Sequence, residues 1–206
     1  MKKINKILIT VIPFVAILSI VGIFFISIFI FPKEKIIIPE QFKRYTALRD
    51  TLHHRYFMDY NQTRLLAPII IETADIFGIN QWVIVAMIKV ESDFDYFALN
   101  KKNKDYGLMQ INVKTGEEIA DKLDMPFFKE MLYDPYFNIL FGCFYFDELR
   151  SICRAQPFFA DSFKNIIIAY NYGIGNYYEF RKGKKKLPDD YQHWQKIEKE
   201  FKKLTN

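Results

Sequence analysis

Residues 7–31 form a run of 25 residues without one charged side chain, and this run restricts the fold more strongly than any other feature of the sequence. A helix of that length spans roughly 37 Å, enough to cross a hydrocarbon core of about 30 Å. Such a core offers the backbone no water, so the run is stable there as a helix. A cleaved signal peptide would have an apolar core of about 7–15 residues and a small-residue cleavage site. This run is longer and ends in FIFP, so we expect an uncleaved, single transmembrane helix.

The lysines that flank this run predict its orientation. Three lysines precede it, at positions 2, 3 and 6, whereas the segment KEK follows it at positions 33–35. Positive charge is enriched on the cytoplasmic side of a membrane, so residues 1–6 are expected to be a cytoplasmic tail. The body of the chain is then expected on the side away from the cytoplasm, which in a bacterium is the periplasm or wall space beyond the inner (cytoplasmic) membrane.

The composition of the remaining chain excludes several classes of function. From Lys33 onward there are 26 basic and 24 acidic residues, a balance that is not typical of proteins that bind nucleic acid. The two cysteines form no CxxC pair and the chain has three histidines, so we expect no metal site and no cofactor. The basic run 181–186 (RKGKKK) predicts a solvated loop, or alternatively a site that docks to an anionic wall polymer or to lipid headgroups.

The remainder of the chain is expected to be a stalk followed by one helical domain. Residues 32–62 mix charged and aromatic side chains over one amphipathic helix and predict a stalk or linker, and residues 63–206 predict the main domain. No stretch alternates with the two-residue period of a strand, so the expected fold class is all-α. Helices are expected over residues 63–77, 81–91, 135–154, 161–170 and 189–204, with Thr63, Asn80 and Asp134 as caps of the first three.

One carboxyl group stands at an unfavourable place for a charge. Residues 82–90 (WVIVAMIKV) are apolar on nearly all sides of the expected helix, which is typical of a helix inside a core, and Glu91 follows them directly. At the end of a buried helix, the helix dipole and the loss of water both favour the protonated form of the group. A carboxylic acid that keeps its proton near neutral pH suits the general acid of glycosidic-bond cleavage. Alternatively, Glu91 is simply the first exposed residue after a buried helix.

Three short motifs favour the first interpretation. Glu91-Ser92 is followed by the segment 107–111 (GLMQI) and then by the segment 169–173 (AYNYG). In order and spacing, this series resembles the lytic transglycosylases of the soluble-type (SLT) family, whose catalytic domain is related to goose-type lysozyme. The resemblance covers about residues 63–206, and it implies an all-α, lysozyme-like catalytic domain behind the anchor. Secondary matches are Asp134-Pro135, Asn138, Ile139 and Gly142.

The resemblance also implies a role for individual residues of these motifs. Glu91 matches the family's sole catalytic acid/base. The residues that match substrate-binding positions are Ser92, Gly107, Met109, Gln110, Tyr170 and Asn171. Amides and phenols of this kind bind the hydroxyl and N-acetyl groups of sugars. For Met109 and its apolar neighbours at 108 and 111, a role in the core alone stays open.

The expected activity is that of a membrane-anchored peptidoglycan lytic transglycosylase, a lyase of the glycosidic bond. In the implied mechanism Glu91 protonates the oxygen between N-acetylmuramic acid and N-acetylglucosamine. It then takes the proton of the sugar's own primary hydroxyl, which closes a 1,6-anhydro ring without water. The implied partner is the peptidoglycan glycan strand. The implied role is cell-wall remodelling or the insertion of envelope-spanning structures such as a flagellum or a secretion system.

Asp105 is a departure from the family pattern, because many members have small residues before the second motif. An acid at this place is similar to specialised members that open the wall for secretion or flagellar structures. The acid also allows an alternative function, that of a muramidase. A muramidase hydrolyses the same bond with water, and a second carboxylate is usual in such enzymes. A non-catalytic wall-binding or assembly protein on the same scaffold is the alternative from a different class.

Overall fold

The computed structural model describes residues 39–155, 163–187 and 192–206. Contacts divide the chain into two compact units, Met1–Lys43 and Arg44–Asn206. The expected transmembrane run, residues 7–31, lies outside the described residues. Among the residues that are described, no helix combines the length and the apolar character needed to cross a membrane. The anchor therefore stays a prediction.

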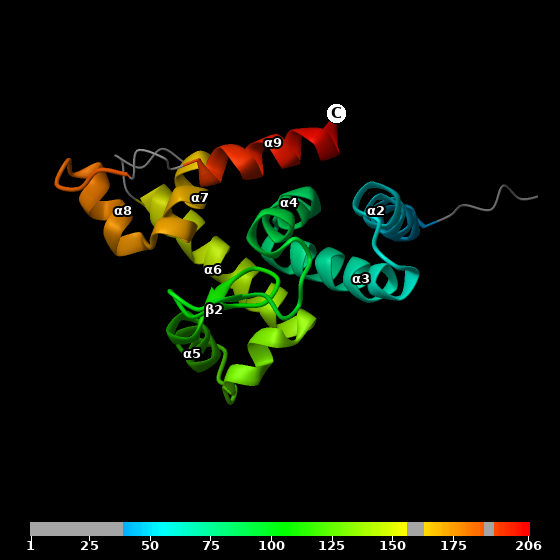
Figure 1. Ribbon diagram of the computed structural model, residues 1–206, viewed down its shortest axis with the longest axis horizontal. Coiled ribbons are helices and arrows are strands. Elements are labelled where there is room, and N and C mark those ends of the chain that lie inside the picture. Colours follow the sequence, from blue (N-terminus) through cyan, green and yellow to red (C-terminus); the bar gives the residue numbers. More distant parts are fainter. Residues whose placement is uncertain (1–38, 156–162, 188–191) are drawn as a thin grey trace, which may run out of the picture. The chain divides into compact units, whose positions relative to one another are not determined.

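The described residues form mostly helices, with one small antiparallel sheet (Figure 1). In chain order the elements are α2 (Glu40–Tyr56), α3 (Tyr60–Phe77), α4 (Gln81–Ser92), β1 (Leu99–Asn100), β2 (Asp105–Tyr106), β3 (Ile111–Asn112), α5 (Val113–Lys122), the 3-10 helix η1 (Lys129–Tyr133), α6 (Pro135–Ala155), α7 (Phe163–Tyr172), α8 (Ile174–Arg181) and α9 (His193–Thr205). A mainly helical body is confirmed. The all-α prediction is wrong about the sheet, because strands of two residues are too short to show an alternating pattern.

Local hydrogen bonds determine where the first helices of the body begin. α3 begins at Tyr60 rather than at Thr63, because the side chain of Asp59 accepts bonds from two backbone N–H groups of the first turn. Thr63 is instead fully buried, and its hydroxyl donates to the carbonyl oxygen of Tyr60 at 2.9 Å. Gly78, with φ of 57°, ends α3 in the left-handed conformation that a residue without Cβ adopts readily. Asn80 caps α4 as expected.

The expected helices of the C-terminal half are confirmed, with some different ends. α6 begins at Pro135, where the carboxylate of Asp134 accepts bonds from two backbone N–H groups at 2.9 and 3.2 Å. α7 continues to Tyr172 and α9 to Thr205. The beginnings expected for these two helices, at residues 161 and 189, lie outside the described residues.

The helix that carries Glu91 lies in the centre of the packing. Every residue of α4 from Val83 to Ile88 is buried, and α4 lies between α9 and α3 (Figure 1). Burial of one large aliphatic side chain contributes about 1.5–3 kcal/mol, so α4 is held firmly on several sides. The C-terminal end of α4 is therefore a fixed point of the domain.

Part of the expected stalk, residues 32–62, belongs to the compact unit Arg44–Asn206. Leu48 and Leu52 of α2 are fully buried, and the guanidinium of Arg44 donates to the side chain of Gln81 at 3.0 Å. The unit thus begins before residue 63, where we expect the main domain to begin. The physical reason is that the apolar face of α2 needs a partner to cover it.

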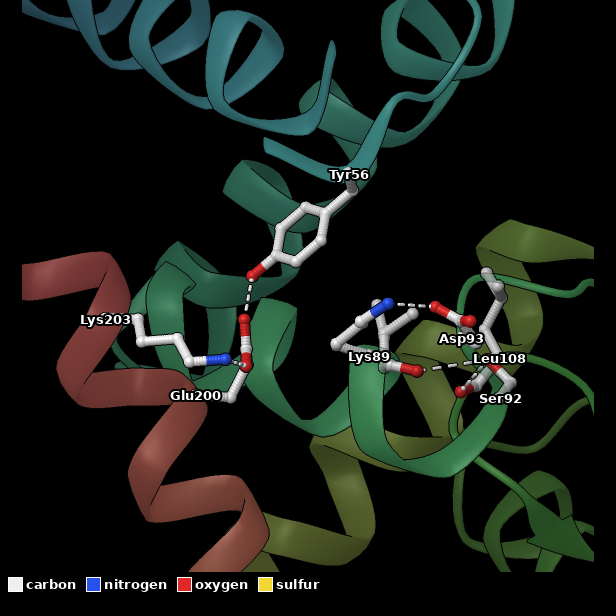
Figure 2. A network of polar contacts seen from close by, with 8 residues as sticks. Tyr56, Lys89, Ser92, Asp93, Leu108, Glu200 and Lys203 are labelled. Carbon is white, nitrogen blue, oxygen red and sulfur yellow. Dashed lines mark hydrogen bonds and ion pairs between the residues drawn. The ribbon is translucent and has the colours of Figure 1, made fainter. Parts of the chain in front are cut away.

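A network of polar contacts connects α2, α9 and α4 (Figure 2). The hydroxyl of Tyr56 donates to Oε1 of Glu200 at 2.8 Å, and Nζ of Lys203 donates to Oε2 at 2.8 Å. Burial disfavours the charge of Glu200, but the bonds from Lys203 and Tyr56 lower the pKa of Glu200 below its usual value. On α4, Lys89 pairs with Asp93, and its ammonium lies 5.4 Å from the centre of the Tyr56 ring. Tyr56 of α2 thus contacts both α9, through Glu200, and α4, through Lys89.

Candidate active site

A cleft of about 570 Å³ lies where the C-terminal end of α4 meets the small sheet and the last helices. Amides, hydroxyls and carboxyl groups predominate among its lining residues, which suits a ligand rich in hydroxyl and amide groups. The lining residues are Val90, Glu91, Asn100, Asn103, Asp105, Gln110, Ile111, Asn112, Thr115, Tyr145, Tyr170, Asn171, Tyr172, Gly173, Asn176 and His193. Within the described ranges, no group of three or more His, Cys, Asp or Glu residues is arranged to hold a metal ion.

Glu91 lies in the last turn of α4, and Asp93, the C-cap of this helix, has the left-handed conformation with φ of 54°. The side chain of Glu91 is 8% exposed and lines the cleft. Its Oε1 lies 2.8 Å from Nε2 of His193, the first residue of α9. The carboxyl group is thus nearly buried, stands at the negative end of a helix, and has an imidazole as its partner.

Sequence reasoning missed several residues of this cleft, among them Asn112, Tyr145 and Asn176, and it assigned no role to His193. His193 lies 102 positions after Glu91, and a contact of that separation leaves no periodic or local pattern in a sequence. The chain has three histidines, and no pattern around position 193 indicates that this one lies beside a carboxyl group.

Ser92 holds the end of α4 against the second motif. Its hydroxyl bonds to the carbonyl oxygen of Leu108 at 2.8 Å and to that of Ile88 at 3.1 Å (Figure 2). Ser92 is absent from the lining of the cleft. The structure therefore gives the hydroxyl two backbone partners, and its expected contact with substrate stays a prediction.

Two residues of the second motif belong to the core rather than to the cleft. Met109 is fully buried and packs where Gly142 of α6 has no side chain. Gly107 has a φ of 72°, and a Cβ there would overlap the carbonyl oxygen of Leu132 and the side chain of Asn138. Of the open interpretations for Met109, the structure thus supports packing.

Gln110 is the residue of the second motif whose polar side chain reaches the cleft. Its backbone has a φ of 50°, which is uncommon for a residue with a side chain. Its Nε2 donates to the carbonyl oxygens of Gly107 at 2.9 Å and Ala98 at 3.3 Å. The side chain is thus tied to the turn that it follows and is fixed in orientation at the wall of the cleft.

A row of polar residues crosses the small sheet and faces the cleft. In the antiparallel register Asn100 pairs with Asp105, and Asp105 pairs with Asn112; all three line the cleft. Burial raises the pKa of Asp105, and the amides of Asn112 and Asn103 partly offset this effect. Nδ2 of Asn112 donates to Oδ1 of Asp105 at 3.1 Å. Asp105 is thus a second carboxyl group of the cleft, held by amide donors.

The third motif supplies the wall from α7. The hydroxyl of Tyr170 donates to the carbonyl oxygen of Met109 at 3.0 Å, and its ring lies 5.2 Å from that of Tyr145. Burial and then the charge of Glu91 raise the pKa of Tyr170 well above its usual value, so the phenol keeps its proton. Asn171, the next residue, also lines the cleft.

The basic run 181–186 folds against the same wall. Nζ of Lys185 donates to Oδ1 of Asn176 at 2.6 Å, and the hydroxyl of Tyr172 donates to the carbonyl oxygen of Lys186 at 3.1 Å. Asn176 and Tyr172 both line the cleft. The run therefore lies close to the cleft, and its role stays a prediction.

Comparison with known proteins agrees with the motifs. Residues 68–193, more than half of the chain, match the family model of the transglycosylase SLT domain. The chain belongs to this family, as the motifs predict.

The chain also resembles a solved structure, that of an inactive mutant of lytic transglycosylase Slt from Pseudomonas aeruginosa. The TM-score is 0.50 at 20% sequence identity, and the similarity covers 79% of this chain and 26% of the other. Our chain thus spans about a quarter of the length of that protein, and the similarity supports the lysozyme-like fold alone. No curated protein matches the chain.

Proposed function

We propose that the protein is a peptidoglycan lytic transglycosylase. It cleaves the β-1,4 bond between N-acetylmuramic acid and N-acetylglucosamine and leaves 1,6-anhydro-N-acetylmuramic acid ends. The observation that carries the proposal is Glu91, a carboxyl group that is 8% exposed in a polar cleft of an SLT-family domain. The cleft offers amides and phenols that suit the N-acetyl and hydroxyl groups of a glycan strand.

The proposed reaction needs one acid/base. Glu91 gives its proton to the bridging oxygen, and the bond from that oxygen to C1 of the muramic acid residue breaks. The substrate's own N-acetyl group stabilises the cationic C1. The carboxylate of Glu91 then takes the proton from the primary hydroxyl, whose oxygen bonds to C1. Because both reacting groups are on one ring, the second step gains from proximity, an effect of up to about 7–11 kcal/mol in well-oriented cases.

A muramidase is the second candidate, and Asp105 is the observation that favours it. Asp105 lines the same cleft as Glu91, and a hydrolase usually needs a second carboxylate that directs water or stabilises the sugar cation. The amide of Asn112 occupies one oxygen of Asp105, which supports a role for Asp105 in holding the sheet. We therefore place the transglycosylase first.

The central experiment replaces Glu91 by Gln, an amide of nearly the same shape that cannot donate and retrieve a proton. Turnover of purified peptidoglycan by Glu91→Gln should fall by about 10²–10⁴-fold or to background, with unchanged circular dichroism. Glu118→Gln is the matched control, since Glu118 lies on α5 and its side chain is 58% exposed. Turnover by Glu91→Gln at the rate of Glu118→Gln would contradict the assignment.

The location and role of the enzyme are part of the proposal. The charge-free run 7–31 and the lysines before it support a single-pass anchor in the bacterial inner membrane, with the domain in the periplasm or wall space. There it would serve wall remodelling or the insertion of an envelope-spanning structure. A reporter that is active only outside the cytoplasm, fused after Asn206, should be active. If only a reporter that works in the cytosol is active at this position, the proposed orientation is wrong.

A further inference from the structure

We infer that His193 is the positioning residue of Glu91: it holds Oε1 of the carboxyl group, so that Oε2 carries the proton that is transferred in the cleft. The inference rests on the proposed role of Glu91 as acid/base. It assigns a function to the contact between Glu91, at the end of α4, and His193, at the beginning of α9, which lies outside the three sequence motifs.

The contact is short and shielded from water. Nε2 of His193 and Oε1 of Glu91 are 2.8 Å apart, and the side chains are 18% and 8% exposed. A hydrogen bond to a group that carries charge is stronger than one between neutral groups, and more so where water is excluded. An imidazole at this distance therefore restricts the carboxyl group to one orientation.

The position of the imidazole depends on α9, which contacts the rest of the domain further along its length. His193, Ile197 and Glu200 follow the i, i+4, i+7 spacing of one helix face. Ile197 is fully buried, and Glu200 bonds to the hydroxyl of Tyr56 (Figure 2). Because α9 packs mainly against α4, these anchors fix the place of the His193 ring relative to Glu91.

The same hydrogen bond serves both halves of the proposed reaction. With a proton on Nε2, the ring donates to the carbonyl oxygen of the protonated acid and later to the carboxylate. Glu91 stands at the negative end of α4, where a carboxylate is disfavoured, so this donor offsets part of that cost once the proton has left. The other ionisable groups that line the cleft are Asp105, Tyr145, Tyr170 and Tyr172. In the part of the chain that the structure describes, the ring of His193 hydrogen-bonds to the Glu91 carboxyl group.

The effect on the kinetic constants separates a positioning role from a structural one. Without the donor from His193 the carboxyl group loses its orientation, so kcat should fall while KM stays nearly unchanged. A purely structural role of His193 would lower activity in every variant at this position, including one that restores a donor at the place of Nε2.

Two variants of the full chain separate the roles. The amide nitrogen of Gln reaches about as far as Nε2 of histidine, whereas the amide of Asn ends near the place of Nδ1. His193→Gln should keep kcat within a few-fold of the wild type. His193→Asn should lose roughly 10- to 100-fold in kcat with little change in KM. His54→Asn, at an exposed position on α2, is the control and should match the wild type.

The outcomes are distinguishable from failure of the proposed function. If Glu91→Gln is inactive while both His193 variants match the wild type, the positioning role is refuted and the acid/base stands. Equal losses of kcat in both His193 variants, with matched circular dichroism, would also refute it. Full activity of Glu91→Gln would instead refute the proposed function on which the inference rests.

Discussion

The backbone N–H of Met109 donates to Oδ1 of Asn138 at 2.7 Å, deep inside the domain where Asn138 has no exposed surface. Nδ2 of the same side chain donates to the carbonyl oxygens of Tyr106 and Leu132 at 2.8 and 2.7 Å. One amide on α6 thus holds three points of the backbone around the second motif. The position of Gln110 in the cleft depends on a residue that is not itself in the cleft.

Asn138→Asp should therefore destabilise the protein, although the two side chains have nearly the same size. The substitution places a carboxylate oxygen against the two carbonyl oxygens that now accept from Nδ2. An uncompensated buried charge costs about 3–5 kcal/mol, so the free energy of unfolding in urea at neutral pH should fall by that amount. Asn61→Asp, at an exposed site in the first turn of α3, should leave stability unchanged or slightly higher. Equal stability of the two variants would contradict the role of the Asn138 amide in holding the backbone around the second motif.

A pair of glycines separates the cost of backbone conformation from that of crowding. Gly107 and Gly183 have nearly the same φ, 72° and 71°, but a Cβ at position 183 meets nothing within 4 Å. Gly183→Ala should cost about 1–2 kcal/mol for the left-handed conformation. Gly107→Ala should cost about 1–3 kcal/mol more, because its Cβ also overlaps its neighbours. Thermal unfolding of both variants measures this difference. Equal decreases in the unfolding midpoint would show that a Cβ at position 107 is not crowded.

Glu200 should make stability depend on acid pH. Its folded-state pKa is lowered, so the unfolded state binds more protons, and stability is lost as pH falls from the unfolded value of about 4.3 through the lower folded value. Glu200→Gln should be about 1–2 kcal/mol less stable than the wild type at pH 7, with a smaller difference below pH 4.

The matched control for that variant is Glu198→Gln on the same helix. Glu198 pairs with Lys202 at 2.9 Å, and its side chain is 35% exposed, so the cost should be at most about 1 kcal/mol. Urea unfolding of both variants at pH 7 and pH 3.5 provides the comparison. A difference between the wild type and Glu200→Gln that stays constant over this range would contradict the role of the Glu200 carboxylate.

Features that depend on local residues could be predicted from the sequence. Asn80 and Asp134 cap the helices that they precede, and the apolar run that ends in Glu91 is buried. Thr63 misled the prediction for α3, since Asp59, four residues earlier, provides a stronger acceptor for the first turn.

Features that depend on distant residues could not be predicted in this way. The strands have two residues each, and the polar row at Asp105 becomes visible only when their register is known. The contact of His193 with Glu91 and that of Tyr56 with Glu200 span 102 and 144 positions. Such contacts arise from helix packing and leave no local pattern in the sequence.

The most direct test of the central claim is the mass of the product. Lytic transglycosylase and muramidase share the acid Glu91 and differ in the nucleophile that attacks C1, which is the primary hydroxyl of the same ring or water. Digestion of peptidoglycan by the purified protein should give muropeptides that end in 1,6-anhydro-N-acetylmuramic acid. These ends are one water, about 18 Da, lighter than reducing ends and resist borohydride, because ring closure replaces hydrolysis. Mass spectra dominated by reducible ends would contradict the transglycosylase and favour a muramidase that uses Asp105.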